Sequence, residues 1–192
     1  MVIEMELIMK GLNIIQDIER MLNNPIYNEQ WRQVDGYANY YVSNCGRVKN
    51  ITTEMILKQR LNRTGYYVID LHEFGNKKTY ETHRLVALAF IDNNENCLCV
   101  DHKNNDKRNN TVKNLRWCTT QQNSMNRSKT CGTSSKYKGV CYYKRNKRWQ
   151  SQIGLNGKYI ALGYYKTQEE AGEAYNKKAT ELFGEFAKLN KI

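Results

Sequence analysis

The chain has 192 residues, 40% of them hydrophobic and 26% charged, which is enough for one mid-sized domain or two small ones. Its 30 Lys and Arg side chains outnumber 19 Asp and Glu, so the formal net charge is +11, and 14 Tyr accompany them. This excess indicates a polyanionic partner, and the tyrosines favour nucleic acid over a membrane. No apolar run approaches the roughly 18 residues of a membrane span. Glu4, Glu6 and Lys10 interrupt the opening stretch too early for a signal peptide, so we expect an intracellular protein of the cytoplasm or nucleus.

The charge is distributed unevenly along the chain. Residues 1–30 carry two basic and five acidic side chains, residues 31–132 carry sixteen and nine, and residues 133–192 carry twelve and five. The net charges of these segments are therefore −3, +7 and +7. The positive field belongs to the body of the chain and to its C-terminal third.

Six cysteines are expected to be free thiols, because disulfides are rare in intracellular proteins. They are Cys45, Cys97, Cys99, Cys118, Cys131 and Cys141. Zinc is a weaker alternative, since the chain contains no Cys-x-x-Cys pair.

The first element predicted is a helix over residues 1–24, where apolar side chains recur at steps of three and four before Pro25. It either packs on the body or binds a partner. Residues 31–82 then contain short runs rich in Tyr, Val and Ile between turn signals, which predicts a small antiparallel sheet. Residues 83–90 predict a helix with apolar residues on one side.

Residues 91–127 predict a strand near 98–102, an Asn-rich loop, a strand over 115–119, and a helix opened by Thr119 or Thr120. Residues 128–135 have the composition of a linker. Three strands are expected after it, at 137–143, 148–153 and 158–165, with a hairpin turn at Asn156-Gly157 and a closing helix over 167–183. The predicted fold class is α+β.

Four polar side chains of the second region could perform chemistry together. Asp101 and His102 end one predicted strand, Asn114 begins the next, and Asn123 falls on the helix that follows. A carboxylate and an amide oxygen can bind a hard divalent cation, and a neutral imidazole can take a proton from water. These types suit phosphodiester hydrolysis, although an arbitrary Asp-His pair is more often an ordinary loop feature.

The surrounding motifs resemble two known families. Residues 100–110, with 114–119 and Asn123, resemble the ββα-metal motif of HNH nucleases, in the form found in homing endonucleases. Residues 83–87 and the upstream motifs at Trp31, 36–37, 40–44 and 46–48 resemble the NUMOD-type module that accompanies such nucleases. The resemblance implies a NUMOD-like module over residues 29–82 and a nuclease core over 83–127.

The same resemblance implies roles for the site residues. His102 would be the general base, Asp101 and Asn123 the metal ligands, and Asn114 the residue that holds the loop and orients the site. The family usually has His where Asn123 stands, and a neutral amide implies modest metal affinity. The oxygen ligands favour Mg²⁺ or Mn²⁺ over zinc. His83 is expected to pack at the corner before its helix, with a role near the scissile phosphate as the alternative.

Basic side chains surround this set, and we expect phosphate contacts from Lys103, Arg108 and Arg116. In the C-terminal region, strand alternation puts Gln150, Gln152 and Gly154 on one face and Trp149, Ser151 and Ile153 on the other, which suits packing. The first face is expected to read DNA in a major groove. The side chains expected on or around it are Lys138, Tyr142, Lys144, Arg145, Lys147, Gln150, Gln152 and Tyr159.

Motifs over residues 136–190 resemble the plant APETALA and ethylene-response-factor (ERF) DNA-binding domain. They include 137–140, 148–149, 162–165, 169–171, 174–176 and 189–190. Lys138, Cys141 and Tyr159 replace base-contacting arginines of the plant domains, so their sequence preference is not carried over.

These patterns together predict a metal-dependent endonuclease that cuts duplex DNA and is positioned by its C-terminal domain, with no small-molecule cofactor. The alternative is a non-catalytic DNA-binding transcription regulator with a degenerate HNH core. RNA binding would explain the charge, but it would not explain the four site residues.

Overall fold

The computed structural model describes residues 29–127 and 134–192. They form two compact units. The first unit comprises residues 29–92 and Lys107–Lys113, and the second comprises Asn93–Asp106 and Asn114–Ile192. The helix expected over residues 1–24 and most of the expected linker lie outside the described residues.

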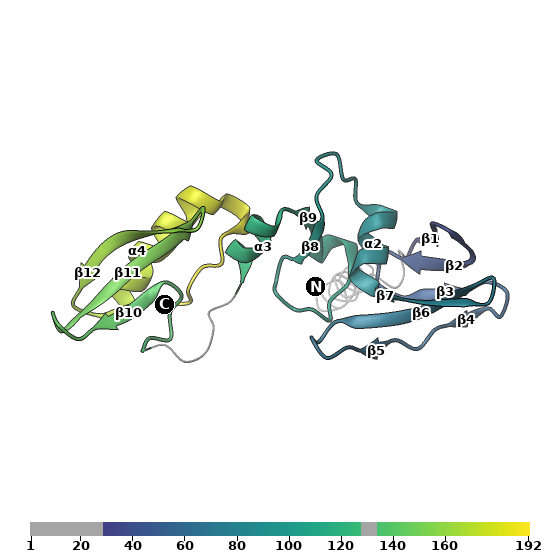
Figure 1. The fold of residues 1–192 in the computed structure, drawn as a ribbon, viewed down its shortest axis with the longest axis horizontal. Coiled ribbons are helices and arrows are strands. Elements are labelled where there is room, and N and C mark those ends of the chain that lie inside the picture. Colours follow the sequence, from purple (N-terminus) through teal and green to yellow (C-terminus); the bar gives the residue numbers. More distant parts are fainter. Residues whose placement is uncertain (1–28, 128–133) are drawn as a thin grey trace, which may run out of the picture. The chain divides into compact units, whose positions relative to one another are not determined.

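The first unit consists of two small antiparallel sheets and one helix, α2, which spans Thr82–Phe90 (Figure 1). One sheet has the order β1-β2-β3-β4 and the other β5-β6-β7. Their strands are β1 Trp31–Val34, β2 Tyr37–Ser43, β3 Val48–Asn50, β4 Met55–Ile56, β5 Arg60–Leu61, β6 Tyr67–Glu73 and β7 Asn76–Glu81. The sequence predicted a single sheet here. With two sheets, apolar residues of both can share one core with α2, where Val42, Leu71 and Val86 are fully buried.

The second unit begins with the strand pair β8 Cys99–His102 and β9 Leu115–Cys118, followed by α3 Thr120–Asn126. The predicted strand, strand, helix order is confirmed. Thr119 is the N-cap of α3, and its hydroxyl accepts from the Gln122 backbone N–H while the Gln122 side chain accepts from the Thr119 N–H. This capping box fixes where the short helix begins.

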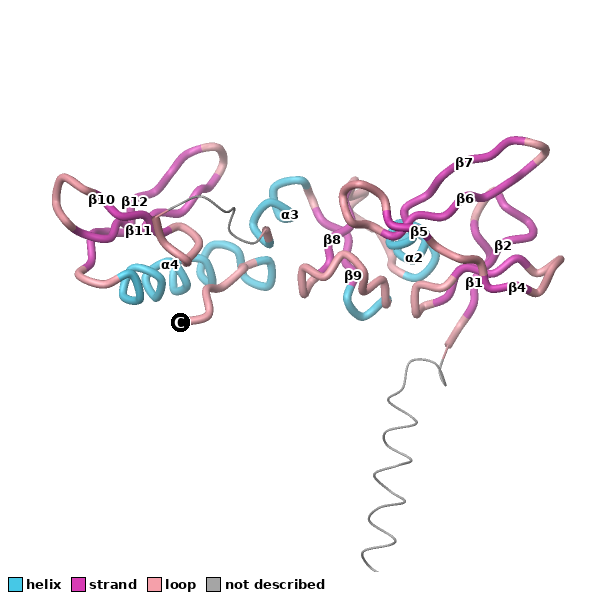
Figure 2. The backbone as a smooth tube through the Cα atoms, turned by 90° about the horizontal axis from the view of Figure 1, so that it is seen from below, coloured by secondary structure: helices cyan, strands magenta, loops and turns pink. Residues whose placement is uncertain are grey.

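A three-stranded sheet and a long helix complete the second unit. The strands are β10 Val140–Tyr143, β11 Arg148–Leu155 and β12 Lys158–Tyr165, and the helix is α4 Gln168–Phe183, followed by the 3₁₀ turn η2 Gly184–Phe186. As predicted, a turn at Asn156-Gly157 joins β11 to β12. Helix α4 runs along one face of the sheet and buries Ala171, Tyr175 and Ala179 against it (Figure 2).

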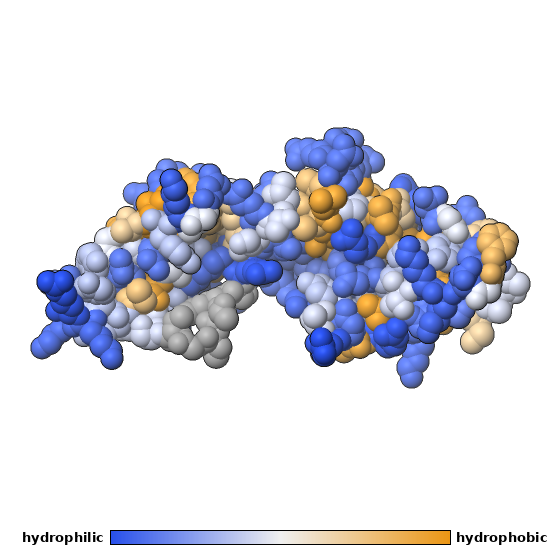
Figure 3. All heavy atoms as spheres, in the orientation of Figure 1, coloured by the Kyte–Doolittle hydropathy of each residue, from blue (hydrophilic) through white to orange (hydrophobic). Residues whose placement is uncertain are grey.

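The surface of the described residues is predominantly polar. Hydrophilic residues cover most of the face drawn in Figure 3, and apolar residues lie between them in small groups. None of the helices within residues 29–127 and 134–192 has the length and apolar character needed to cross a membrane. Among the described residues, five cysteines are free thiols: Cys45, Cys97, Cys99, Cys118 and Cys141.

At Gly46, the loop Lys107–Lys113 packs against the rest of the first unit. Its φ is +83°, and a Cβ there would lie 2.7 Å from the Asn110 Cβ and 3.1 Å from the Asn110 carbonyl oxygen. Gly36 has a similar φ of +75°, but nothing lies within 4 Å of a Cβ built on it. The two glycines therefore separate backbone strain from crowding.

We expect Gly36→Ala to lower the free energy of unfolding by about 1–2 kcal/mol, the cost of a left-handed alanine. Gly46→Ala should lose this amount and a further 1–3 kcal/mol or so, because its methyl group would crowd Asn110. Urea unfolding of both variants measures the difference. Equal losses would show that the loop yields without cost and does not pack as described.

Candidate active site and DNA-binding face

The Asp101 carboxylate is the most strongly held group of the candidate site. Strand pairing places Asp101 opposite Arg116, and the Arg116 Nε and Nη2 donate to Asp101 Oδ2 at 2.9 and 2.8 Å. The side chains are 6% and 11% exposed, respectively. A buried carboxylate needs such a partner, because the desolvation of an unpaired charge is costly. Arg116, expected to contact phosphate, is thus engaged inside the protein.

Asn126, which the sequence analysis did not single out, completes this network. Its Nδ2 lies 3.0 and 2.9 Å from the Asp101 Oδ1 and Oδ2 and 3.0 Å from the His102 carbonyl oxygen. Its own Oδ1 accepts from the Asn105 Nδ2 at 3.0 Å. Asn126 lies three residues after Asn123, about one helical turn, and this spacing was the signal that could have identified it.

The loop after β8 is fixed by Asn114. The Asn114 Oδ1 accepts from the Asn104 backbone N–H at 3.1 Å, and its carbonyl oxygen accepts from the Lys103 N–H at 2.8 Å. His102, the last residue of β8, is 5% exposed, and its carbonyl oxygen also accepts from the Asn105 N–H at 2.8 Å. The start of the Asn-rich loop is therefore held by side-chain as well as backbone hydrogen bonds.

The candidate oxygen ligands for a cation are Asp101 and Asn123, as the resemblance to HNH nucleases implies. Asp101 Oδ2 accepts three of the hydrogen bonds above, whereas Oδ1 accepts one and keeps the capacity for another ligand. Asn123 is half-buried on α3, which packs against β8. Among the described residues, no group of three or more His, Cys, Asp and Glu could hold a metal by itself. A carboxylate with an amide fits a hard divalent cation that keeps several waters.

Two candidate residues, His83 and Arg108, belong to the first unit. His83 is buried at the start of α2, its ring centroid is 4.9 Å from that of Tyr66, and its Nε2 is 3.6 Å from the Glu81 Oε2. These contacts support the packing role for His83. The Lys107 ammonium lies 4.6 Å from the centroid of the same Tyr66 ring.

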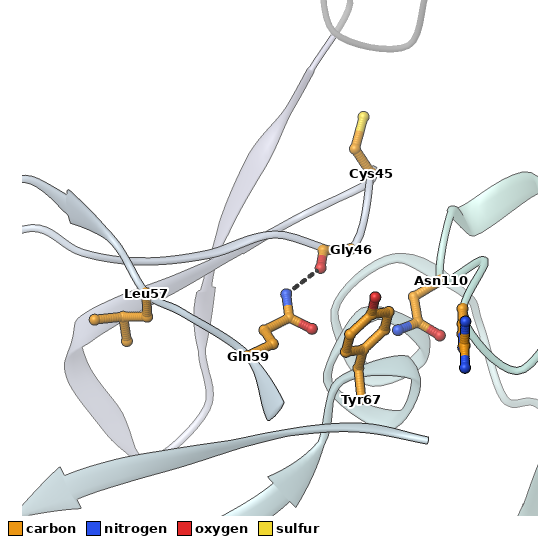
Figure 4. A pocket seen from close by; sticks show the side chains of 7 residues that line it. Cys45, Gly46, Leu57, Gln59, Tyr67 and Asn110 are labelled. Atoms are coloured by element: carbon orange, nitrogen blue, oxygen red, sulfur yellow. Dashed lines mark hydrogen bonds between the residues drawn. The ribbon is translucent and has the colours of Figure 1, made fainter. Parts of the chain in front are cut away.

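Arg108 lines a small polar pocket of about 260 Å³. Figure 4 shows the Gln59 side chain in this pocket, where its Nε2 donates to the Gly46 carbonyl oxygen at 2.7 Å, and Tyr67 and Asn110 lie nearby. The Gln59 Oε1 in turn accepts from the Thr82 hydroxyl at 2.7 Å. These groups all belong to the first unit, whereas Asp101 belongs to the second.

The register of the C-terminal sheet defines its two faces. Val140 pairs with Ser151 and Tyr142 with Trp149, and Val140, Ser151 and Trp149 face α4. The opposite, open face carries Cys141, Tyr143, Arg148, Gln150, Gln152, Tyr159 and Tyr164. Gln150, Gln152 and Tyr159 therefore share the open face, as the sequence analysis expected. Its placement of Tyr142 there was wrong, because cross-strand partners share a face and the partner of Tyr142 is Trp149.

The expected basic residues fall into two groups. Lys144, Arg145 and Lys147 are exposed around the turn from β10 to β11. Lys138 points inward, where its Nζ donates to the carbonyl oxygens of Met125 and Arg127 at 2.6 and 2.8 Å. Burial, with a smaller effect of Lys188, lowers the pKa of Lys138 to about 8. Lys138 therefore caps the C-terminal end of α3 instead of lying on the open sheet face.

The paired strands β8 and β9, with Asp101 and His102 buried at the end of β8, and the helix α3 that follows them form a ββα unit. Family models agree with this description: the NUMOD4 motif matches residues 29–72, and the HNH endonuclease model matches residues 80–125.

Known relatives match both halves of the chain. DNA endonuclease I-HmuI of Bacillus phage SP01 is 42% identical over 98 residues, which are 50% of this chain and 56% of that protein. Its solved structure, described as DNA binding and cleavage by the HNH homing endonuclease I-HmuI, covers the same shares with a TM-score of 0.48. The ethylene-responsive transcription factor WRI1 of Arabidopsis thaliana is 47% identical over 58 residues, 29% of this chain and 14% of that protein.

A third relative is the uncharacterized HNH endonuclease L560 of Acanthamoeba polyphaga mimivirus. It is 38% identical over 136 residues, 70% of this chain and 67% of that protein. The chain belongs to the HNH endonuclease family. It spans a little over half the length of I-HmuI.

The two asparagines of α3 should respond differently to substitution. Asn126→Ala leaves the buried Asp101 carboxylate and the His102 carbonyl oxygen short of a donor, so we expect it to lower the free energy of unfolding by about 1–3 kcal/mol. Asn123→Ala, at a half-buried position of the same helix, should change it by less than about 0.5 kcal/mol. Chemical denaturation of both variants tests this, and equal effects would contradict the described role of Asn126.

Proposed function

We propose that the protein is a metal-dependent endonuclease that hydrolyses phosphodiester bonds in duplex DNA. In this proposal residues 29–82 form a NUMOD-like module, residues 83–127 the nuclease core, and residues 136–190 a DNA-reading domain. The observation that carries the proposal is the Asp101 carboxylate, which is fixed by Arg116 and Asn126 beside His102. Matches to the HNH model and to I-HmuI support it.

Each side chain has a distinct role in the proposed reaction. The His102 imidazole takes a proton from the attacking water, and Asn114 holds the loop that follows His102. The oxygens of Asp101 and Asn123 would hold the cation, with Mg²⁺ or Mn²⁺ favoured over zinc. A cation held there would supply Lewis-acid chemistry, that is, polarisation of the phosphoryl oxygen and stabilisation of the leaving 3′ oxygen. Lys103 and Arg108, both exposed, provide phosphate contacts.

The open face of the C-terminal sheet is the proposed DNA-reading surface. Gln150 and Gln152 can donate to and accept from base edges, and Arg148 stands on the same face. The exposed turn with Lys144, Arg145 and Lys147 provides charge for the phosphate backbone. Similarity to WRI1 over this segment supports the assignment.

Substitution of His102 separates cutting from binding. Loss of a general base slows a reaction by about 10² to 10⁴, so His102→Ala should nick supercoiled plasmid at least about a hundredfold more slowly. Its dissociation constant for DNA should change by less than about threefold, because Lys and Arg elsewhere dominate binding. Nicking rates with Mg²⁺ and Mn²⁺, with EDTA as the control, and gel-shift titrations measure both quantities.

Two outcomes would overturn the proposed activity. In one, His102→Ala nicks as fast as the wild type. In the other, the wild type binds duplex DNA but does not cut it with either metal across many sequences, and the alternative of a non-catalytic DNA-binding regulator is then favoured.

Neighbouring tyrosines of β10 test the reading face. Tyr143 lies on the open face, where its ring centroid is 5.6 Å from that of Tyr164, whereas Tyr142 contacts Trp149 on the face toward α4. We expect Tyr143→Ala to weaken DNA binding by about 1–2 kcal/mol and Tyr142→Ala to leave it nearly unchanged. Fluorescence anisotropy with labelled duplex DNA measures both. A stronger effect of Tyr142→Ala, with the variant folded, would argue for the opposite face.

A further inference from the structure

The Arg116 guanidinium contacts the C-terminal module, which comprises residues 134–192, as well as Asp101. Its Nη1 donates to the Glu185 carbonyl oxygen at 2.9 Å and to the Glu185 Oε2 at 3.3 Å. The Phe186 ring lies against it, with 3.8 Å between the Arg116 Cζ and the ring centroid. Both residues belong to η2, directly after α4. One arginine thus holds Asp101 with one edge and the end of the C-terminal module with another.

This arrangement determines which oxygen of Asp101 can face a cation. The planar guanidinium directs Nε and Nη2 at Oδ2, so Oδ1 keeps free capacity. The guanidinium can hold that orientation only if its own plane is fixed. Phe186 fixes the plane by stacking, and the Glu185 carbonyl oxygen fixes the remaining edge. Glu185 Oε2 adds less, because the Glu185 side chain is 73% exposed.

The helix that carries Asn123 is held by the same module. Lys138 caps the end of α3 through the carbonyl oxygens of Met125 and Arg127, and the Met125 side chain packs against the core that includes Ile153 and Tyr175. At the start of α3, the Gln121 side chain donates to the Asn156 side chain. A helix of seven residues has little stability of its own, so these contacts fix its position.

We propose that the C-terminal module is a positioning element for the metal ligands of the nuclease site, in addition to being a DNA-binding domain. Arg116 and Phe186 are positioning residues, which act through Asp101. This inference rests on the proposed function, since it takes Asp101 and Asn123 to be the metal ligands. Partners that orient metal ligands commonly change metal affinity by about 10–100-fold when removed.

The test measures Mn²⁺ binding by the full chain without DNA, by the electron paramagnetic resonance signal of free Mn²⁺. Phe186→Ala should weaken binding by about tenfold or more, because the Arg116 plane is released. Phe74→Ala is the matched control: Phe74 is 95% exposed on the β6–β7 hairpin, and its loss should leave Mn²⁺ binding unchanged. In NMR spectra, the side-chain Nε–H resonance of Arg116 should shift in Phe186→Ala and stay unchanged in Phe74→Ala.

Nicking then separates positioning from general damage. In Phe186→Ala the Mn²⁺ concentration for half-maximal nicking should rise in step with the dissociation constant, while the rate at saturating Mn²⁺ stays within about threefold, since the ligands remain. If Phe186→Ala does not fold, Arg116→Lys replaces it. This variant keeps the charge but loses the fork of donors, and the same loss of Mn²⁺ affinity is expected.

The outcomes distinguish this inference from the proposed function. If Asp101→Ala binds Mn²⁺ as tightly as the wild type, the ligand assignment fails, and this inference fails with it. If Asp101→Ala loses Mn²⁺ while folded Phe186→Ala binds it as tightly as the wild type, the positioning role alone is wrong. Tighter Mn²⁺ binding by Phe186→Ala would also overturn it, because the module would then restrain the site instead of supporting it.

Discussion

The pairing of Asp101 with Arg116 is the interaction on which the second unit depends. A carboxylate with 6% of its side chain exposed would be too costly to ionise without a close cation and hydrogen-bond donors. The β8–β9 register provides the cation directly across the hairpin, and α3 provides the Asn126 amide. The position of α3 against the hairpin is therefore tied to the needs of one buried charge.

This constraint explains which parts of the site followed from the sequence. Asp101, His102, Asn114 and Asn123 were proposed as site residues from motifs, and the order strand, strand, helix was predicted from periodicity and the capping residue Thr119. The inward position of Arg116 could not be predicted, because a long Asn-rich loop separates the two strands and no turn chemistry fixes their register. Arg116 therefore resembled the exposed basic residues around it. Asn126 was missed because its only signal was its spacing of three residues from Asn123, in a helix whose other residues are mostly polar.

The C-terminal sheet shows a similar limit. Alternation assigned the faces of β11 correctly, with Gln150 and Gln152 opposite Ser151 and Ile153. For β10, alternation gives two possible phases, and only the burial of Val140 against α4 selects one of them. A shift of one residue exchanges every side chain between faces, which is why Tyr142 was assigned to the wrong side. Lys138 was wrongly predicted to lie at the reading face. The sequence does not determine its direction, because a long basic side chain can reach inward to cap a helix as readily as outward to solvent.

The contacts within the second unit argue against a C-terminal module that is merely tethered to the hairpin. If the module were flexibly tethered, the Arg116 Nη1 and the carbonyl oxygens at the end of α3 would be exposed to water. Water would then provide their hydrogen bonds, and no contact with the module would be needed. In the structure, the Glu185 carbonyl oxygen and the Phe186 ring cover the guanidinium, and the Lys138 ammonium replaces water at the helix end. Lys138 loses hydration there, and its pKa falls to about 8 as a consequence. An ammonium buried at this cost is stable only while its two carbonyl partners stay in place. The end of α3 and the C-terminal sheet are therefore held as one body by the same bonds that compensate the buried charge.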